Sequence, residues 1–271
     1  MIRPIDPNDL RRRIRSATPF PHVLIDNFLD EHFARQVHDS FPMYEDARKI
    51  GQAFTTVNER KKVQVTDVAQ FAPPVRELNR ILAEPGWIEK LSFAFDVPDL
   101  LADDELIGGG IHQTGARGRL DVHVDFNYIA ERKLHRRLNI LLFLNPGWKP
   151  EWGGRLELWD QKVTRCHHSF EPLFNRCVVF ETNEISFHGV TAVNCPPDRV
   201  RRSFAAYYYS KQPPAHWTGE EHGTMFRSRP DEVIKGHVLM PAERVVRGMR
   251  QAMWDVRRRI KRIVKGTPPG A

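Results

Sequence analysis

The feature that most restricts the fold is a series of short apolar segments between residues 105 and 210. Each segment is bounded by Gly, Pro, Asn or charged residues, and the first three of these commonly end strands and form tight turns. The segments read ELIGGGIHQ, DVHVDFNY, RLNILLFLN, GGRLELWD, RCVVFETN and RRSFAAYYYS. In the fourth, Leu156 and Leu158 alternate with Arg155, Glu157 and Trp159, as in a strand with one buried face. This pattern predicts an all-β sandwich or barrel.

The chain before this region predicts a short strand followed by helices. The first helix begins near Asp30, whose carboxylate is a suitable N-cap. Three apolar residues then recur at helical spacing on one stripe: Phe33, Val37 and Phe41. Two more helices are expected over about 74–82 and 87–95. These elements are expected to flank and support the β core.

Composition excludes several classes of protein. The chain has 271 residues, 41% of them hydrophobic, which is enough for a sizeable core, and it has no run of 18 apolar residues that could span a membrane. The opening segment is too polar to serve as a secretory signal. The three cysteines, Cys166, Cys177 and Cys195, suggest neither a disulfide framework nor a zinc site. A reducing cytoplasm is therefore the expected location.

The net charge of +7 does not by itself indicate a nucleic-acid partner. Residues 242–265 hold nine Arg or Lys against two acidic residues, Glu243 and Asp255, so much of the excess lies in one short segment. The remainder of the chain is closer to balance, and it carries no recognisable nucleic-acid-binding motif. The sequence therefore does not predict a nucleic-acid partner.

Two polar residues in the second segment point to a metal site. His123 and Asp125 are two positions apart, so on a strand their side chains project from the same face. His188, which directly follows another strand, supplies a third ligand of a suitable type. Two histidines and one carboxylate on one side of an ion form the facial triad that suits non-haem Fe(II). Three coordination positions then stay open for oxygen and a co-substrate.

A 2-oxo acid co-substrate with a second carboxylate would need a buried cation to receive that carboxylate. The last strand supplies one, because Arg201 and Ser203 lie on one of its faces. A guanidinium can bind a carboxylate through two hydrogen bonds, and the serine hydroxyl can add a third.

The order of these segments resembles the 2-oxoglutarate/Fe(II) dioxygenases of the prolyl-4-hydroxylase-like group, most of all the bacterial members. The resemblance covers residues 105–210, with a weaker echo in PHVLIDNFL. It implies a double-stranded β-helix, or cupin-type jelly roll. It also implies that His123, Asp125 and His188 bind iron, that Arg201, beside Ser203, binds 2-oxoglutarate, and that ascorbate supports the enzyme.

Two departures from the group's pattern leave alternatives open. Many relatives carry a tyrosine that binds the same carboxylate, and here that position holds Phe143. The spacing from His188 to Arg201 is longer than usual, so Arg199 and Arg202 are alternative partners of 2-oxoglutarate, although strand parity favours Arg201. Two further residues fall where relatives place polar groups near the metal and the co-substrate: Gln113 and Asn139.

The resemblance implies hydroxylation of an unactivated C–H bond, with release of succinate and CO2. Asp125 favours hydroxylation or desaturation over halogenation, because related halogenases have Gly or Ala at that position. The alternative is a non-catalytic or hydrolytic cupin-type metal-binding protein. The substrate is open between an amino acid, a peptidyl proline, a glycan precursor and another small molecule. Residues 44–70 and 126–137 are expected to form the loops that select it.

The sequence divides into three parts within one expected compact domain: 1–104, a β core over 105–211, and an extension over 212–271. Apolar residues in the extension recur every three or four positions, with basic residues around them, which predicts an amphipathic helix. Such a helix packs on the core as a brace or contacts an anionic membrane or an acidic carrier. The brace is the favoured reading.

Overall fold

The computed structural model describes residues 1–215, 217–232, 235 and 239–240. The chain forms two compact units, Met1–Arg227 and Ser228–Ala271. The basic helix expected over 242–265 lies outside the described residues, so its role stays a prediction. Within the described part of the chain, no helix combines the length and apolar character needed to cross a bilayer.

The first unit begins with helices and continues into strands. The helices are α1 (Pro7–Arg15), α2 (Glu31–Asp39), α3 (Tyr44–Ile50), α4 (Pro73–Leu82) and α5 (Pro85–Phe95), with short 3-10 turns η1 (Val68–Gln70) and η2 (Pro150–Trp152). The early strands are β1 (His22–Ile25), β2 (Gln52–Thr55), β3 (Glu59–Val65), β4 (Leu101–Ala102), β5 (Gly110–Val124) and β6 (Tyr128–Ile129). The later ones are β7 (Leu134–Phe143), β8 (Leu156–Trp159), β9 (Cys166–Phe170), β10 (Arg176–Glu181), β11 (His188–Val190), β12 (Val200–Ser210) and β13 (Met225–Arg227).

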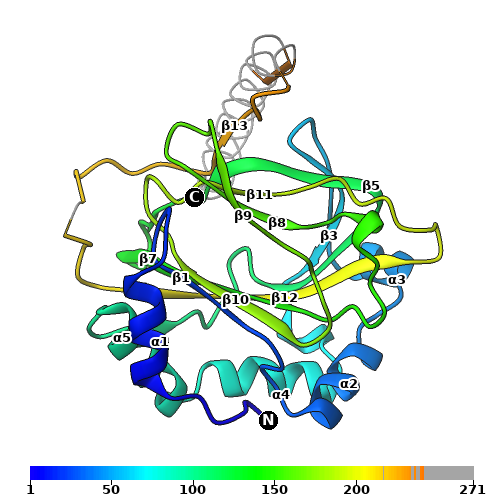
Figure 1. Ribbon diagram of the computed structural model, residues 1–271. Coiled ribbons are helices and arrows are strands. Elements are labelled where there is room, and N and C mark those ends of the chain that lie inside the picture. The colour runs from blue at the N-terminus through cyan, green and yellow to red at the C-terminus, as the bar shows by residue number, and fades with distance from the viewer. Residues whose placement is uncertain (216, 233–234, 236–238, 241–271) are drawn as a thin grey trace, which may run out of the picture. The chain divides into compact units, whose positions relative to one another are not determined.

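The strands form one antiparallel sheet that curls into two facing layers. Its main path runs β1-β10-β7-β12-β5-β11-β8-β9, so strands distant in sequence become neighbours. In Figure 1 the strands β1, β10, β7 and β12 form one layer, and β5, β11, β8 and β9 form the other. Helices α1, α2, α4 and α5 cover the outer side of the first layer. The predicted jelly-roll core with flanking helices is confirmed.

Strand β12 shows how the sequence separates the two sides of the first layer. Its even-numbered apolar residues, Phe204, Ala206 and Tyr208, pack in the large core under the helices. The hydroxyl of Tyr208 donates to the Leu82 carbonyl at 2.8 Å. The odd-numbered Ala205, Tyr207 and Tyr209 belong to a separate cluster on the inner face. Because successive side chains alternate, β12 packs against the helices on its outer face and against a separate cluster on its inner face.

Several local predictions before residue 105 are confirmed, and others were incomplete. The Asp30 carboxylate accepts from the Phe33 amide and caps α2, as expected. Helices α4 and α5 occupy the two further predicted positions. Residues 44–70, expected as substrate-selecting loops, instead contain α3, the β2–β3 hairpin and η1.

Candidate active site

Strand pairing brings the three predicted metal ligands together. His123 lies on β5, Asp125 directly follows that strand, and His188 begins β11. His123 and His188 are cross-strand partners. One ligand atom from each of the three residues lies within 4.8 Å of the others. Among the described residues, these three form the cluster of His, Cys, Asp or Glu side chains that could hold a metal ion. The facial arrangement expected from the sequence is therefore present.

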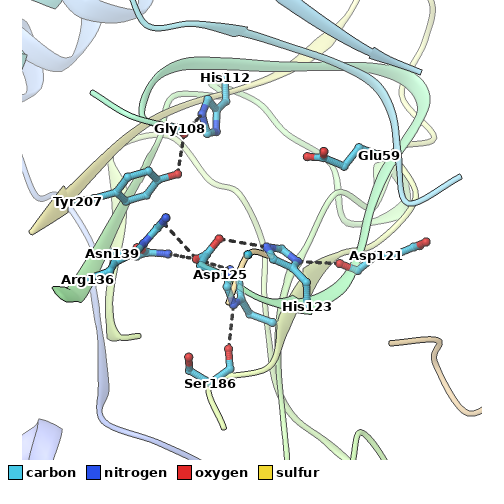
Figure 2. A network of polar contacts seen from close by, with 12 residues as sticks. Glu59, Gly108, His112, Asp121, His123, Asp125, Arg136, Asn139, Ser186 and Tyr207 are labelled. Carbon is cyan, nitrogen blue, oxygen red and sulfur yellow. Dashed lines mark hydrogen bonds and ion pairs between the residues drawn. The ribbon is translucent and has the colours of Figure 1, made fainter. Parts of the chain in front are cut away.

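Both histidines are oriented by backbone carbonyls. The Nδ1 atom of His123 lies 2.8 Å from the Asp121 carbonyl, and Nδ1 of His188 lies 2.9 Å from the Ser186 carbonyl. A carbonyl only accepts, so each Nδ1 carries the proton and each Nε2 presents a lone pair. Figure 2 shows the His123–Asp121 contact to the right of Asp125 and the contact to Ser186 below it. Hydrogen bonds of this kind fix the tautomer that metal-binding histidines need.

Both histidines are buried, and burial keeps His188 available as a neutral ligand. His123 and His188 are each 4% exposed. Burial, with the neighbouring His123, lowers the pKa of His188 to about 3. An imidazole that resists protonation keeps its lone pair free for a cation, so Nε2 of His188 suits Fe(II).

The carboxylate of Asp125 has two polar partners besides the histidines. Asn139 Nδ2 donates to its Oδ2 at 2.7 Å, and a terminal nitrogen of Arg136 lies 3.2 Å from the same oxygen. Burial by itself raises the pKa of Asp125, but the charge of Arg136 and the contacts with both histidines outweigh it and hold the pKa well below its usual range. The site therefore contains an ionised carboxylate beside two imidazoles whose Nδ1 atoms face carbonyls, a donor set that suits a divalent iron ion.

Arg201 provides a buried positive charge on the inner face of the sheet. Its side chain donates to the Gly154 carbonyl at 2.7 Å and to Ser203 Oγ at 3.4 Å, and its guanidinium lies 4.9 Å from the centre of the Phe143 ring. No carboxylate among the described residues pairs with it. Burial lowers the pKa of Arg201 to about 10, which still leaves it charged at neutral pH. A buried cation of this kind is satisfied by an anionic ligand.

A continuous wall of side chains connects Arg201 with the metal ligands. Phe143, beneath the guanidinium, belongs to the same apolar cluster as Phe180. The Phe180 ring centre lies 4.7 Å from that of His188. The cation and the triad therefore face one interior, whose apolar walls can exclude water from a bound co-substrate.

Strand register distinguishes Arg201 from its two alternatives. Arg199 is exposed, and Arg202 points to the outer face, where its guanidinium contacts His38 Nε2 at 3.2 Å. Arg201 alone of the three is buried on the inner side. The binding of 2-oxoglutarate by Arg201 and Ser203 stays a prediction, and this placement supports it.

The expected position of Gln113 does not agree with the structure. Gln113 pairs with Arg202 across the strands and therefore shares its outer face, where its amide donates to the Pro42 carbonyl at 2.7 Å. The adjacent His112 pairs with Ser203 and takes the inward position. Asn139 does lie at the metal site, where it contacts a ligand carboxylate rather than the predicted co-substrate residues.

Two residues of the site were missed in the sequence. Arg136 contacts Asp125, and its guanidinium carbon lies 3.6 Å from the Tyr207 ring centre. His112 holds the Gly108 carbonyl at 3.0 Å, and burial, together with the charge of Lys62, lowers its pKa well below the usual value. The doubled Arg136–Arg137 on an otherwise apolar strand was the available signal for the first residue.

Comparison with known families places the site in context. The model of the 2OG-Fe(II) oxygenase superfamily matches residues 109–209, which contain the triad and Arg201. A Mus musculus protein named Prolyl 3-hydroxylase OGFOD1 is 24% identical over 229 residues. That alignment covers 73% of this chain and 35% of the mouse protein, so the chain spans about a third of the length of its curated relative.

Solved structures with prolyl hydroxylase activity in their descriptions share the fold. A Trichoplax adhaerens prolyl hydroxylase, in complex with a peptide fragment of hypoxia inducible factor, aligns with a TM-score of 0.54 at 14% identity, covering 75% of this chain and 88% of that one. A Pseudomonas putida prolyl-4-hydroxylase aligns with a TM-score of 0.53 at 17% identity, covering 73% and 97%. At these identities the likeness establishes the fold alone.

Proposed function

We propose that this chain, a member of the 2OG-Fe(II) oxygenase superfamily, hydroxylates prolyl residues of a peptide or protein. The dioxygenase class follows from the superfamily match and the triad. The choice of a peptidyl proline is the proposed step. The alternative of a non-catalytic or hydrolytic cupin explains neither the superfamily match nor the buried Arg201.

His123, Asp125 and His188 would hold the iron, since they offer two oriented nitrogens and one ionised carboxylate. Fe(II), with 2-oxoglutarate and O2, supplies the oxidising power for C–H hydroxylation and releases succinate and CO2. The protein supplies the positions of the reactants and a site from which water is excluded.

The observation that carries the proposal is the buried guanidinium of Arg201, which lies on the same inner face as the triad. Among the described residues, no carboxylate pairs with it. It supports a dicarboxylate co-substrate held at one end by the metal and at the other by Arg201. Ser203 Oγ lies at the guanidinium and can donate to the same carboxylate. Phe143 replaces the tyrosine of many relatives, so this chain lacks that hydroxyl beside Arg201.

Support for a prolyl substrate comes from the relatives. The mouse protein is named a prolyl 3-hydroxylase, and the fold is shared with prolyl 4-hydroxylases. The substrate class that these relatives share is a peptide that contains proline. Which carbon of the proline ring is hydroxylated has to be measured.

Succinate release with a peptide library tests the proposal. We expect Fe(II), 2-oxoglutarate and O2 to give succinate in proportion to peptides that contain proline, with a mass gain of one oxygen on the prolyl residue. Peptides with alanine in place of proline, and the Asp125→Ala variant, are the matched controls. Turnover with free amino acids or sugars, and none with any prolyl peptide, would replace the substrate class while leaving the dioxygenase class intact.

The proposed setting is the cytoplasm. Two of the three cysteines, Cys177 and Cys195, are buried thiols, which is compatible with a reducing compartment. We expect ascorbate to prolong turnover by keeping iron in the Fe(II) state. Loss of activity that ascorbate does not slow would argue against oxidation of the metal as the cause.

A further inference from the structure

The two oxygens of Asp125 have different surroundings. Oδ2 receives the Asn139 amide at 2.7 Å and the Arg136 guanidinium at 3.2 Å. Each oxygen also lies 3.5 Å from a histidine Nε2, Oδ1 from that of His123 and Oδ2 from that of His188. Oδ1 has no further donor among the described residues. In Figure 2 Asn139 and Arg136 approach the carboxylate from one side and His123 approaches it from the other. The two oxygens therefore differ in that only Oδ2 is held by Asn139 and Arg136.

We propose that Arg136 and Asn139 form a clamp that occupies Oδ2 of Asp125 and leaves Oδ1 as the atom presented to the metal. Both residues are positioning residues, because they act on the metal through Asp125. The inference rests on the metal centre of the proposed function but not on its substrate. It also gives Asn139, expected from the sequence near the metal and the co-substrate, a specific role in supporting a metal ligand.

The clamp saturates one oxygen. A carboxylate oxygen has about two lone-pair directions, and two donors fill those of Oδ2. A metal that used Oδ2 would have to displace a 2.7 Å hydrogen bond or the contact with a guanidinium. Oδ1 carries no such cost, so a single bond through Oδ1 is favoured over a bond through both oxygens.

A bulge in β7 brings the two clamp residues to the same side. Residues three apart on a regular strand point to opposite faces. Here Tyr207 pairs with Asn139 and Tyr209 with Arg136, and the register shifts between Tyr208 and Tyr209 because β7 contains one extra residue, Arg137. A bulge redirects the side chains on either side of it. This irregularity turns Arg136 inward beside Asn139.

Further contacts hold the clamp rigid. Nε and a terminal nitrogen of Arg136 donate to Asn139 Oδ1 at 3.0 and 2.8 Å, which fixes the amide with its NH2 group toward Asp125. The guanidinium lies between two rings, with centres 3.6 Å away for Tyr207 and 4.6 Å away for Phe126. Tyr207 is itself tied to the Gly108 carbonyl at 2.7 Å. Arg136 therefore has one available position.

The chain offers a matched control for each clamp residue. Arg137 is the next residue along the strand, is 8% exposed against 3% for Arg136, and donates to Ser210 Oγ. Asn145 is 4% exposed against 3% for Asn139, and its amide binds the carbonyls of Pro172 and Arg202. Both controls are buried and hydrogen-bonded, but their hydrogen bonds go to residues outside the triad. If Arg136 and Asn139 had only a structural role, their variants and the control variants would have the same effect on metal binding.

Binding of Co(II) to the protein without co-substrate or peptide tests the clamp. We expect Asn139→Ala to lower Co(II) affinity about 10–100-fold, the usual effect of losing a partner of a metal ligand. The visible absorption of bound Co(II) should also change as the carboxylate rotates. Arg136→Met should change the absorption in the same way. The Co(II) affinity of Arg136→Met is not used as the readout. Removing a positive charge near the metal should raise this affinity, whereas a misoriented Asp125 should lower it, and the two effects oppose each other.

The control variants decide the result. Asn145→Ala and Arg137→Met should keep the wild-type Co(II) absorption, whatever they cost in thermal stability. Arg136→Lys keeps the charge but not the forked hydrogen bonds, and it should show the changed absorption even if Asn139→Ala does not fold. Wild-type absorption in both Arg136→Met and Arg136→Lys, or equal changes in the controls, would overturn the clamp. A wild-type chain that binds no Co(II) would overturn the metal centre as well, whereas failure with prolyl peptides would not affect this test.

Discussion

At the scale of single residues, Arg201 has a charge that the described side chains do not neutralise. Removing one partner of a buried ion pair costs roughly 3–5 kcal/mol, or about a hundredfold to a few thousandfold in affinity. We therefore expect Arg201→Ala to raise the dissociation constant of 2-oxoglutarate by at least a hundredfold, measured by calorimetry on the Co(II)-loaded protein.

Arg199→Ala and Arg202→Ala serve as controls for Arg201. Arg199 is exposed and Arg202 binds His38 on the outer face, so both variants should bind 2-oxoglutarate within a fewfold of wild type. A larger effect from Arg199→Ala would show that the strand register assigned to Arg201 is wrong.

His112 makes a second residue-scale prediction, about pH. Burial and the charge of Lys62 lower its folded pKa well below the ordinary 6.5, so the unfolded chain binds a proton at this site that the folded chain does not. Stability from His112 is therefore complete above about pH 6.5 and falls as pH decreases, by at most about 1.4 kcal/mol per pH unit. Urea unfolding of wild type should lose more stability between pH 7 and pH 5 than His112→Gln.

Wild type must be compared with His112→Gln, because burial also lowers the pKa of other histidines, His22 and His188 among them. His112→Gln should be less stable than wild type at pH 7. The difference in the free energy of unfolding between the two proteins should be smaller at pH 5. A gap that stays constant would mean that His112 is protonated equally in the folded and unfolded chains.

Most residues of the site could be predicted from the sequence. The main wrong prediction, the inward position of Gln113, is explained by one irregularity in β5. His123, Asp125 and His188 were predictable because their spacing and strand positions require a common face. Counting back in twos from His123 puts Gln113 on that face. The structure places Arg117 at a φ of 66°, and the ladder of β5 with its neighbours shifts register in this region. An odd number of residues then turns His112 inward, and nothing local in the sequence announces such a shift.

At the scale of elements, the turn before β8 determines how closely Arg201 can approach. Gly154 has a φ of +68°, and a Cβ there would lie 2.9 Å from Arg201 Cδ. Alanine would strain the backbone and displace the arginine that donates to the Gly154 carbonyl. We expect Gly154→Ala to weaken 2-oxoglutarate binding about tenfold or more, a displacement effect smaller than the loss of a whole buried partner.

Gly147 serves as a control that separates backbone strain from contact with Arg201. Its φ is +66°, nearly that of Gly154, but a Cβ there would meet nothing within 4 Å. Gly147→Ala should carry the same backbone strain, seen as a lower melting temperature, with unchanged 2-oxoglutarate affinity. Equal weakening by both variants would mean that general destabilisation, rather than contact with Arg201, lowers the affinity.

Elements were predictable where the local signals agreed. Helix α2 has a capping Asp30 and an apolar stripe, and α4 and α5 each begin at a proline. Helix α3 has no side-chain cap, so its start was difficult to predict. The β2–β3 hairpin has mostly exposed residues in β2 and a charged first half in β3, a composition that resembles a loop. Helix α1 did carry an N-cap, Asp6, which the run of arginines obscured.

At the scale of the whole molecule, strand order lies beyond what periodicity can determine. Pattern alone predicts that β5, β7, β10 and β12 are strands, but it does not show that β12 lies between β5 and β7. Such pairings join segments far apart in sequence and depend on the packing of the complete sheet. The resemblance to a known group supplied that order, which is why the fold was predictable and its irregularities were not.

Cys177 allows the stability of this sheet to be measured. It lies on β10, paired with β1 on one side and β7 on the other, and it is fully buried. Burial raises the pKa of its thiol, so alkylation in the native state requires the sheet to open. Cys166, half-buried on β9 at the end of the main strand path, should react with iodoacetamide much faster.

Ligands should slow the alkylation of Cys177 if they bind only the folded chain. Binding lowers the open population by a factor of one plus the ratio of ligand concentration to its dissociation constant, which is about a hundredfold at 100 times that constant. Co(II) with 2-oxoglutarate should therefore slow Cys177 alkylation about a hundredfold and leave Cys166 nearly unchanged. The Asp125→Ala variant should lose most of this protection. Peptide mapping of the alkylated thiols measures both rates at once, and a Cys177 rate that ignores the ligands would mean that β10 opens without disturbing the metal site.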